Sequence, residues 1–295
     1  MEVEIGAPDG PRPEDNRGRL PEVLVEPDWL VNNLESPGTT VLEIARDRPV
    51  AGQSVVLIPG ARRVYWKDLL WDAKRRDFAL PHVLADRLAG LGVSRDTDVV
   101  ICGDPIQFGT YAYWVLRMMD CPRIRILNGG KELWRALDLP LSADTTTGTA
   151  NALGLATVDP STRVGREEVL GSLGSDDLVV VDLRSEEEYL GLRVAPPHAA
   201  DHGAEARGRI PGARHLYYQS LLAPDGRFLG RDEMVDRLQA AGVCLDKPIV
   251  LYCRLGHRAS LGWFCLSELL GFDGARVYDG SWTEWGSMVG MPVER

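Results

Sequence analysis

The chain has 295 residues, and 43 Asp and Glu against 33 Lys and Arg give it a formal net charge of −10. Hydrophobic residues make up 44% and charged residues 26%, which is typical of a globular protein and excludes a chain that is disordered throughout. At about 100–200 residues per domain, this length predicts two domains. The acidic balance argues against nucleic acid as a partner, and no apolar run approaches the ~18 residues of a membrane-spanning helix.

Composition changes along the chain predict where the domains begin and end. Residues 1–19 are acidic, rich in Pro and Gly, and lack the apolar segment of a signal peptide, so we expect a disordered tail and a cytoplasmic protein. Between positions 139 and 160, Ser, Thr, Ala and Gly dominate, as in a linker. We therefore expect a tail at 1–19, a first domain at 20–141, a linker at 142–158 and a second domain at 159–295.

The chain contains an internal repeat. Residues 99–116 align without a gap on residues 249–266, an offset of 150 positions. Four further blocks recur in the same order, and this regularity predicts a tandem duplication. The further pairs are 25–34 with 164–173, 41–44 with 180–183, 58–61 with 210–213, and 127–134 with 278–285.

Within each half, short β-rich runs alternate with helical patterns, which predicts an α/β fold with a mainly parallel sheet flanked by helices. In the second half, residues 177–183 and 248–252 are typical of buried strands. Residues 231–241 and 259–270 have the apolar spacing of helices, and a glycine follows each of them.

The five cysteines include no Cys-x-x-Cys pair and no histidine at zinc-finger spacing, so we expect no metal site. Their odd number indicates free thiols rather than a disulfide framework. Most free cysteines are small buried side chains, so the question is which one is reactive. The cysteines are Cys102, Cys121, Cys244, Cys253 and Cys265.

One cysteine lies in a setting that favours chemistry. An apolar strand ends at Tyr252, and the run Cys-Arg-Leu-Gly-His-Arg at 253–258 then leads directly into a helix. The positive end of that helix and the neighbouring cationic side chains stabilise negative charge, which favours a reactive cysteine at this position. Gly256 lets the backbone fold back so that its N–H groups face the sulfur. We therefore predict that Cys253 is a nucleophile in a cradle that binds an anion.

Three motifs together resemble the rhodanese family. They are Cys253-x-x-Gly256-x-Arg258, Ile-Pro-Gly-Ala at 210–213, and Tyr-Asp-Gly-Ser-Trp-Thr-Glu-Trp at 278–285. The run at 252–258 is especially similar to tandem thiosulfate sulfurtransferases of the actinobacterial type, and the likeness covers residues 23–294. The resemblance implies two rhodanese-like domains, of which only the second carries a catalytic cysteine.

The repeat supports that asymmetry independently. Gly103 takes the place of Cys253, and Cys102 falls one residue early, opposite Tyr252. The positive positions that follow are lost as well, since Gln107 and Phe108 replace His257 and Arg258. We therefore expect the first domain to be an inactive scaffold that closes one side of a cleft.

The resemblance also implies substrate-binding residues. The arginine of an Asp-x-Arg motif binds the substrate anion in the family, and here that residue is Arg184. Arg258 and Gly256 belong to the cradle itself. Two roles stay open: Arg254 contacts the anion or lies at the rim, and His257 tunes the cysteine or points into solvent.

The resemblance implies a ping-pong sulfur transfer. We expect the Cys253 thiolate to take the outer sulfur of thiosulfate, which releases sulfite, or the sulfur of a similar small anionic donor. A thiol, cyanide or a protein cysteine then removes the sulfur from the persulfide. The positive side chains stabilise the anions, so the reaction needs no metal and no cofactor.

Other functions fit the same fold. A 3-mercaptopyruvate sulfurtransferase carries small residues after its cysteine, whereas the arginines here favour thiosulfate. A phosphatase uses a Cys-x5-Arg loop, and only four residues separate Cys253 from Arg258. A persulfide relay protein would pass its sulfur to a biosynthetic partner, whose access the segment 195–208 would shape. A purely structural role is disfavoured because the cysteine is present.

Overall fold

The computed structural model describes residues 22–50, 52, 54–143, 148–151, 153–155 and 158–295. The tail predicted at 1–19 lies outside the described residues, as do parts of the predicted linker. No helix in these described ranges is both long and apolar enough to cross a membrane.

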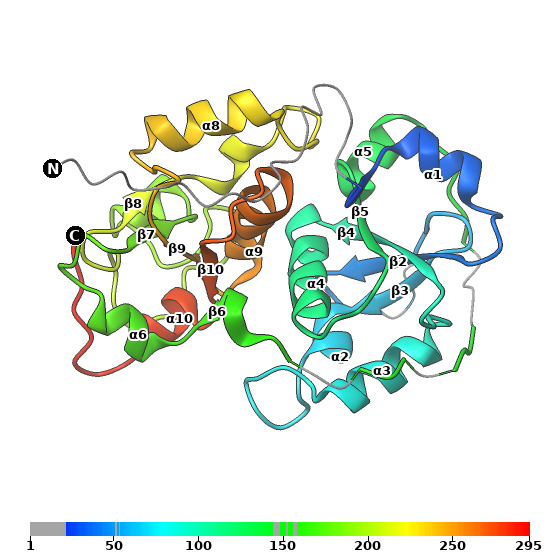
Figure 1. Cartoon of the computed structure of the whole chain (residues 1–295), viewed down its shortest axis with the longest axis horizontal. Coiled ribbons are helices and arrows are strands. Elements are labelled where there is room, and N and C mark those ends of the chain that lie inside the picture. The colour runs from blue at the N-terminus through cyan, green and yellow to red at the C-terminus, as the bar shows by residue number, and fades with distance from the viewer. Residues whose placement is uncertain (1–21, 51, 53, 144–147, 152, 156–157) are drawn as a thin grey trace, which may run out of the picture.

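Each half of the chain folds around a five-stranded parallel sheet, and the two sheets share one strand order (Figure 1). The order is β1-β5-β4-β2-β3 in the first sheet and β6-β10-β9-β7-β8 in the second, so each strand replaces the one numbered five lower. This correspondence confirms the predicted duplication and the α/β fold. The first sheet contains β1 (Leu24–Val25), β2 (Thr39–Ala45), β3 (Arg62–Tyr65), β4 (Asp98–Asp104) and β5 (Ile124–Leu127). The second contains β6 (Arg163–Val164), β7 (Val179–Asp182), β8 (Arg214–His215), β9 (Ile249–Tyr252) and β10 (Ala275–Tyr278).

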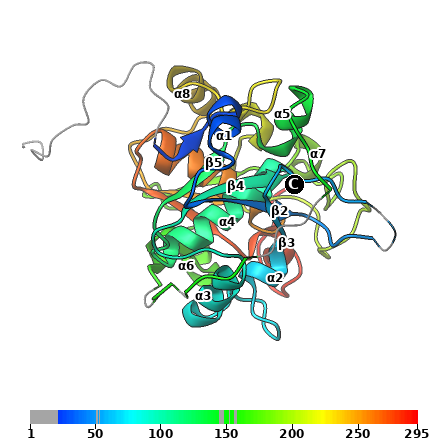
Figure 2. The same ribbon diagram turned by 90° about the vertical axis from the view of Figure 1, so that its right-hand side faces the viewer.

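Helices cover both faces of each sheet, because strand side chains alternate between the faces and both faces here are apolar. In β2, Leu42 packs into the cluster that includes α4, and Val41 packs with Leu30 and Trp134 on the other face. Figure 2 shows α1 and α5 on that second face, with α2, α3 and α4 opposite. The first-domain helices are α1 (Pro27–Asn33), α2 (Trp66–Leu70), α3 (Pro81–Gly90), α4 (Ile106–Met118) and α5 (Gly130–Ala136).

The second domain repeats this arrangement. The strands predicted at 177–183 and 248–252 contain β7 and β9, and the helix predicted at 231–241 is α8. The helix predicted at 259–270 begins two residues earlier as α9 and continues as η3, which is π-helical. The elements are η1 (Pro160–Thr162), α6 (Arg166–Gly171), α7 (Glu186–Tyr189), η2 (Tyr218–Leu221), α8 (Arg231–Ala240), α9 (His257–Trp263), η3 (Phe264–Leu269) and α10 (Ser281–Trp285).

The two domains meet through α4 and α9, which lie side by side between the sheets (Figure 1). Every residue of α9 and nearly every residue of α4 is buried, as expected for helices that are covered all round. The hydroxyl oxygens of Thr110 and Ser260 lie 3.2 Å apart across this interface, and these residues are equivalent in the repeat. Equivalent residues face each other only near a two-fold axis, so the domains are related by approximate two-fold symmetry.

The described part of the predicted linker packs against the first domain. Leu153 and Leu155 are buried in the core, and the Ala150 amide donates to the Ala89 carbonyl at 3.0 Å. This segment therefore adds to the first domain's surface where it is described.

Candidate active site

Cys253 lies at the carboxyl end of β9, in the loop that leads into α9. Its side chain is 1% exposed, and its N–H donates to the Ser281 hydroxyl oxygen at 3.1 Å. The Cys253 carbonyl accepts from the Trp282 amide at 3.0 Å. The segment at 278–285, one of the three motifs, therefore fixes the backbone of the cysteine from the start of α10, which follows the neighbouring strand β10.

Gly256 gives the loop its shape. Its φ is +88°, in the left-handed region that favours glycine. A Cβ at this position would lie 2.6 Å from Asp279 Oδ1 and 2.9 Å from the Tyr111 ring. No other residue fits, and because Tyr111 belongs to α4, the loop is pressed against the first domain.

The loop opens into a cleft of about 730 Å³ between the domains. Cys253 lines this cleft together with Arg254, His257 and Arg258, so the structure brings four of the predicted site residues together. The first domain supplies the opposite wall, as expected for a scaffold that closes one side. Its contribution includes Trp66, Lys67, Ile106, Gln107, Phe108 and Glu132.

Arg258 is bound to a buried carboxylate that the sequence reasoning missed. Its Nη1 lies 2.7 Å from Glu188 Oε2 and its Nη2 lies 2.9 Å from Oε1. Burial lowers the pKa of Arg258, but the Glu188 carboxylate outweighs this effect and raises it. Burial likewise raises the pKa of Glu188, and hydrogen bonds from Arg258 and Ser185 outweigh it and lower it. Both groups are therefore ionised, and the charge of Arg258 is balanced within the protein.

Glu188 had a sequence signal. Ser185 and Glu188 have the spacing of a capping box, and the structure shows both of its hydrogen bonds at the start of α7. The carboxylate thus has two tasks, because it caps α7 through one oxygen and holds Arg258 through both.

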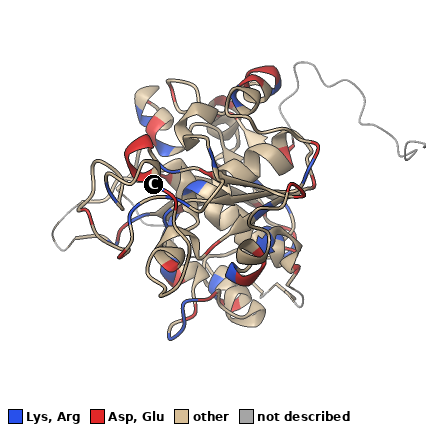
Figure 3. Ribbon diagram, turned by 90° about the vertical axis from the view of Figure 1, so that its left-hand side faces the viewer, with Lys and Arg blue, Asp and Glu red and all other residues tan. Residues whose placement is uncertain are grey.

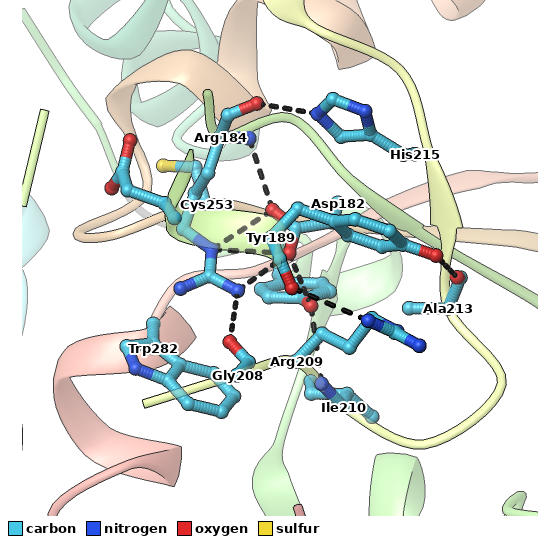
Figure 4. Close-up of polar contacts among 12 residues, drawn as sticks. Asp182, Arg184, Tyr189, Gly208, Arg209, Ile210, Ala213, His215, Cys253 and Trp282 are labelled. Carbon is cyan, nitrogen blue, oxygen red and sulfur yellow. Dashed lines mark hydrogen bonds and ion pairs between the residues drawn. The ribbon is translucent and has the colours of Figure 1, made fainter. Parts of the chain in front are cut away.

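Arg184 also has a balanced charge, and its partner is Asp182 (Figure 4). Its Nη2 lies 2.6 Å from Asp182 Oδ2 and donates to the Gly208 carbonyl at 2.7 Å. The guanidinium lies 4.4 Å from the centroid of the Trp282 ring, and the side chain is fully buried. Arg184 does not line the cleft, and its Nη1 has no hydrogen-bond partner among the residues that the structure describes. Its substrate-binding role therefore stays a prediction.

Arg254 reaches across to the segment at 195–208, which was predicted to lie beside the site. Its Nη2 donates to the His202 carbonyl at 2.8 Å, and a Cβ at Gly203 would lie 2.4 Å from that nitrogen. No carboxylate in the described part of the chain forms an ion pair with this guanidinium. The charge of Arg254 is therefore available to an anion in the cleft.

His257 is buried among aromatic rings of the first domain, so the predicted alternative that its side chain points into solvent is wrong. Its ring centroid lies 4.3 Å from those of Trp66 and Phe108 and 4.4 Å from that of Tyr111. Burial lowers the pKa of His257 well below its usual value, and the positive charge of Arg76 adds to the effect. The imidazole is therefore neutral and adds no positive charge beside Cys253.

The first domain has no room for an equivalent thiol. A Cβ at Gly103 would lie 2.6 Å from the Ile106 carbonyl oxygen and 2.7 Å from the Gly109 amide nitrogen. Cys102 packs on the opposite face of its sheet, where Tyr252 packs in the second domain, and burial raises its thiol pKa well above normal. The loop after β4 is therefore closed where the loop after β9 forms its cradle.

Within the described residues, no group of three or more His, Cys, Asp and Glu side chains is arranged to hold a metal ion. The polar groups that line the cleft include four Lys and Arg side chains against two carboxylates, those of Asp47 and Glu132, so the balance suits an anionic ligand.

Comparison with known proteins agrees with this geometry. Residues 166–288 match the rhodanese-like domain. "Sulfur carrier protein TtuD" of Thermus thermophilus is 35% identical over 93% of this chain and 97% of its own length. "Putative thiosulfate sulfurtransferase SseA" of Mycobacterium leprae is 38% identical over 97% of this chain and 95% of its own. A Mycolicibacterium smegmatis protein, named "Putative thiosulfate sulfurtransferase", is 35% identical over 92% of this chain and 98% of its own.

The fold has solved counterparts as well. The crystal structure of YnjE superimposes with a TM-score of 0.78 at 24% identity, over 93% of this chain and 69% of that one. The chain belongs to the rhodanese family of sulfurtransferases.

Proposed function

We propose that the protein is a thiosulfate sulfurtransferase that works through a persulfide on Cys253. The observation that carries the proposal is the position of Cys253 in a cleft whose wall includes the unbalanced guanidinium of Arg254. The names of the mycobacterial relatives support the same donor.

The first half-reaction loads the cysteine. The Cys253 thiolate attacks the outer sulfur of thiosulfate, a new S–S bond forms, and the S–S bond of thiosulfate breaks with its electron pair leaving on sulfite. One persulfide anion and one sulfite dianion replace one thiolate and one thiosulfate dianion, so the charge is conserved. The Arg254 guanidinium stabilises the negative charge that gathers on the departing sulfite.

The second half-reaction unloads it. A nucleophilic acceptor such as cyanide attacks the outer sulfur of the persulfide, takes it as thiocyanate, and leaves the Cys253 thiolate for the next turn. The Arg258–Glu188 pair holds the cradle in shape through both steps. Removal of either residue would leave the charge of the other buried and uncompensated. In this proposal Gly256 and His257 position the loop, and Arg184, paired with Asp182 at the end of β7, stays a predicted substrate-binding residue.

A persulfide relay is the second candidate, and the size of the cleft favours it. A space of about 730 Å³ is far larger than a five-atom anion needs, so it can also admit a cysteine-bearing chain end of an acceptor protein. One relative is named a sulfur carrier protein. The two candidates share the Cys253 persulfide and differ only in the acceptor.

Mercaptopyruvate is the alternative donor. Comparing kcat/KM for thiosulfate and 3-mercaptopyruvate decides between them, and a preference for mercaptopyruvate would contradict the proposed donor. The five cysteines are free in the structure, as in proteins of a reducing compartment, which supports the proposal that the protein works in the cytoplasm.

Mass spectrometry after incubation with thiosulfate tests the proposal. We expect the mass of one added sulfur on the peptide that contains Cys253, and its removal by cyanide. Cys253→Ser should stay unmodified. Cys244→Ser, which changes an exposed cysteine outside the cleft, should load like the unaltered protein. A protein that gains no sulfur, or that gains it in Cys253→Ser, would refute the mechanism.

A further inference from the structure

Four Lys and Arg side chains line the cleft, and carboxylates of the described residues pair with only two of them. Arg258 pairs with Glu188 at 2.7 Å, and Arg46 pairs with Asp47, also at 2.7 Å. The other two lining cations are Lys67 and Arg254. No carboxylate in the described ranges forms an ion pair with either.

Lys67 belongs to the first domain and is held in place without a carboxylate. It lies in the first turn of α2, and its ammonium nitrogen lies 5.2 Å from the Trp66 ring centroid and 4.9 Å from that of Trp71. Aromatic faces attract a cation but leave its charge uncompensated. Its neighbour Asp68, the nearest carboxylate in sequence, pairs with Arg48 instead.

Lys67 and Arg254 lie on opposite walls of the cleft. Lys67 comes from α2 beside Trp66, and Arg254 follows Cys253 in the loop of the second domain. The charges of both act on His257, which lies between the two walls, and both contribute to lowering its pKa. Among the acidic side chains that line the cleft, Asp47 is already paired, and Glu132 is exposed.

The unpaired cations Lys67 and Arg254 differ from the charge pattern of the second domain. Acidic and basic residues are interspersed along the elements of the second domain rather than gathered by sign (Figure 3). In a chain with a net charge of −10, two unbalanced cations facing one space with a nucleophile mark a place for an anion.

We propose that Lys67 of the first domain binds the anionic end of the sulfur donor, together with Arg254 across the cleft. The proposal rests on the proposed function for the identity of the donor, a small dianion whose outer sulfur faces Cys253. It assigns the first domain a direct part in substrate binding, beyond closing the cleft. It also explains how the site binds a dianion although Arg184 and Arg258 are already neutralised.

Three variants separate charge from structure. Lys67→Met removes the charge and keeps most of the stem, Lys67→Arg restores the charge, and Lys74→Met removes an exposed lysine outside the cleft. The first measurement is sulfite binding to Cys253→Ser protein, followed by tryptophan fluorescence, because Trp66 lines the cleft. We expect Lys67→Met to weaken sulfite binding about tenfold, the equivalent of ~1.4 kcal/mol, with Lys67→Arg and Lys74→Met within about twofold of the parent.

The second measurement is the single-turnover loading of Cys253 at varied thiosulfate. The half-saturating thiosulfate concentration should rise about tenfold in Lys67→Met. The rate at which a thiol without other charged groups discharges the preformed persulfide should stay unchanged, because that acceptor has no anionic end for Lys67 to bind.

The outcomes are distinguishable. Unchanged sulfite binding and unchanged half-saturation in Lys67→Met would overturn this inference and leave the proposed function intact. Equal losses in loading and in discharge would also overturn it, because they would show a structural role for Lys67. Sulfite binding that depends on Lys67 in a protein that never forms a persulfide would support the anion site and refute the proposed function.

Discussion

His257 lies edge-on to the indole of Trp66, with 4.3 Å between the ring centroids, so the first residue of α9 is buried against the other domain. The loop that carries Cys253 is therefore completed by contacts from the first domain, which has no counterpart of that cysteine. Phe108, which takes the place of Arg258 in the repeat, forms another wall of this aromatic site. The replacement that removed a charge from the first domain thus supplies a ring to the second.

The burial of His257 predicts how stability depends on pH. Burial lowers the pKa of His257 in the folded protein, whereas an unfolded histidine titrates near 6.5. Below about pH 6.5 the unfolded state therefore binds a proton that the folded state does not, and this destabilises the folded state. The stability contributed by the neutral imidazole is complete above about pH 6.5 and is lost as the pH falls below that value, by up to ~1.4 kcal/mol per pH unit. Urea unfolding of the protein and of His257→Phe at pH 8 and at pH 5 measures this pH dependence of the unfolding free energy. The two pH values lie about 1.5 units above and below the usual histidine pKa. Equal pH dependence in the two proteins would contradict the prediction.

The Arg258–Glu188 pair predicts a large loss of stability from a small change. Glu188→Gln keeps the shape and removes the charge, which leaves the buried Arg258 guanidinium uncompensated. Breaking such a pair costs about 3–5 kcal/mol. Glu187→Gln is the matched control, because Glu187 is exposed on the same short helix and should change the unfolding free energy by less than about 0.5 kcal/mol. Chemical denaturation of both variants checks the prediction, and similar midpoints would refute it.

Gly256 and Gly271 allow backbone conformation to be separated from contact. Both have positive φ, +88° and +69°, but a Cβ at Gly271 meets nothing within 4 Å, whereas one at Gly256 meets Asp279 and Tyr111. Gly271→Ala should therefore cost only the conformational penalty of about 1–2 kcal/mol. Gly256→Ala should cost more, and only this variant should slow sulfur loading of Cys253. Thermal unfolding gives the first comparison and timed mass spectrometry the second. A Gly256→Ala protein as stable and as active as Gly271→Ala would show that the contact is unimportant.

A cysteine placed in the first domain should stay inert. Gly103→Cys restores the residue type at the equivalent position, but its Cβ would lie 2.6 Å from a carbonyl oxygen that the turn holds in place. We expect a less stable protein that still gains a single sulfur, on Cys253. Peptide mapping after thiosulfate treatment measures this, and a second persulfide at position 103 would contradict it.

The features of the fold and of the site that could be predicted from the sequence are those encoded by residues close together in the chain or by the repeat. The duplication, the strands before each loop and the place of Cys253 are local patterns, and the structure confirms the fold that they indicate. The partners of the charged side chains were not predicted, because they come from distant segments: Glu188 lies 70 positions from Arg258. Within the run Glu186-Glu187-Glu188 nothing in the composition distinguishes the buried residue from its exposed neighbours, except the capping-box spacing.

The same limit applies to the electrostatics of the cleft. Counting charges near Cys253 suggested two arginines and a histidine, but the histidine is neutral and Arg258 is balanced. Lys67 lies 186 positions before Cys253, and only the packing of α4 against α9 brings its wall to the site.

The meeting of Thr110 with Ser260 has a further consequence for assembly. A self-complementary surface of this kind usually joins two separate chains in a symmetric dimer. Here each half already covers the matching surface of the other, so the helices α4 and α9 are sealed inside one polypeptide. The chain therefore resembles a dimer within one polypeptide. Its two halves are always present in equal number, so one half can lack a counterpart of Cys253 while every molecule still contains that cysteine.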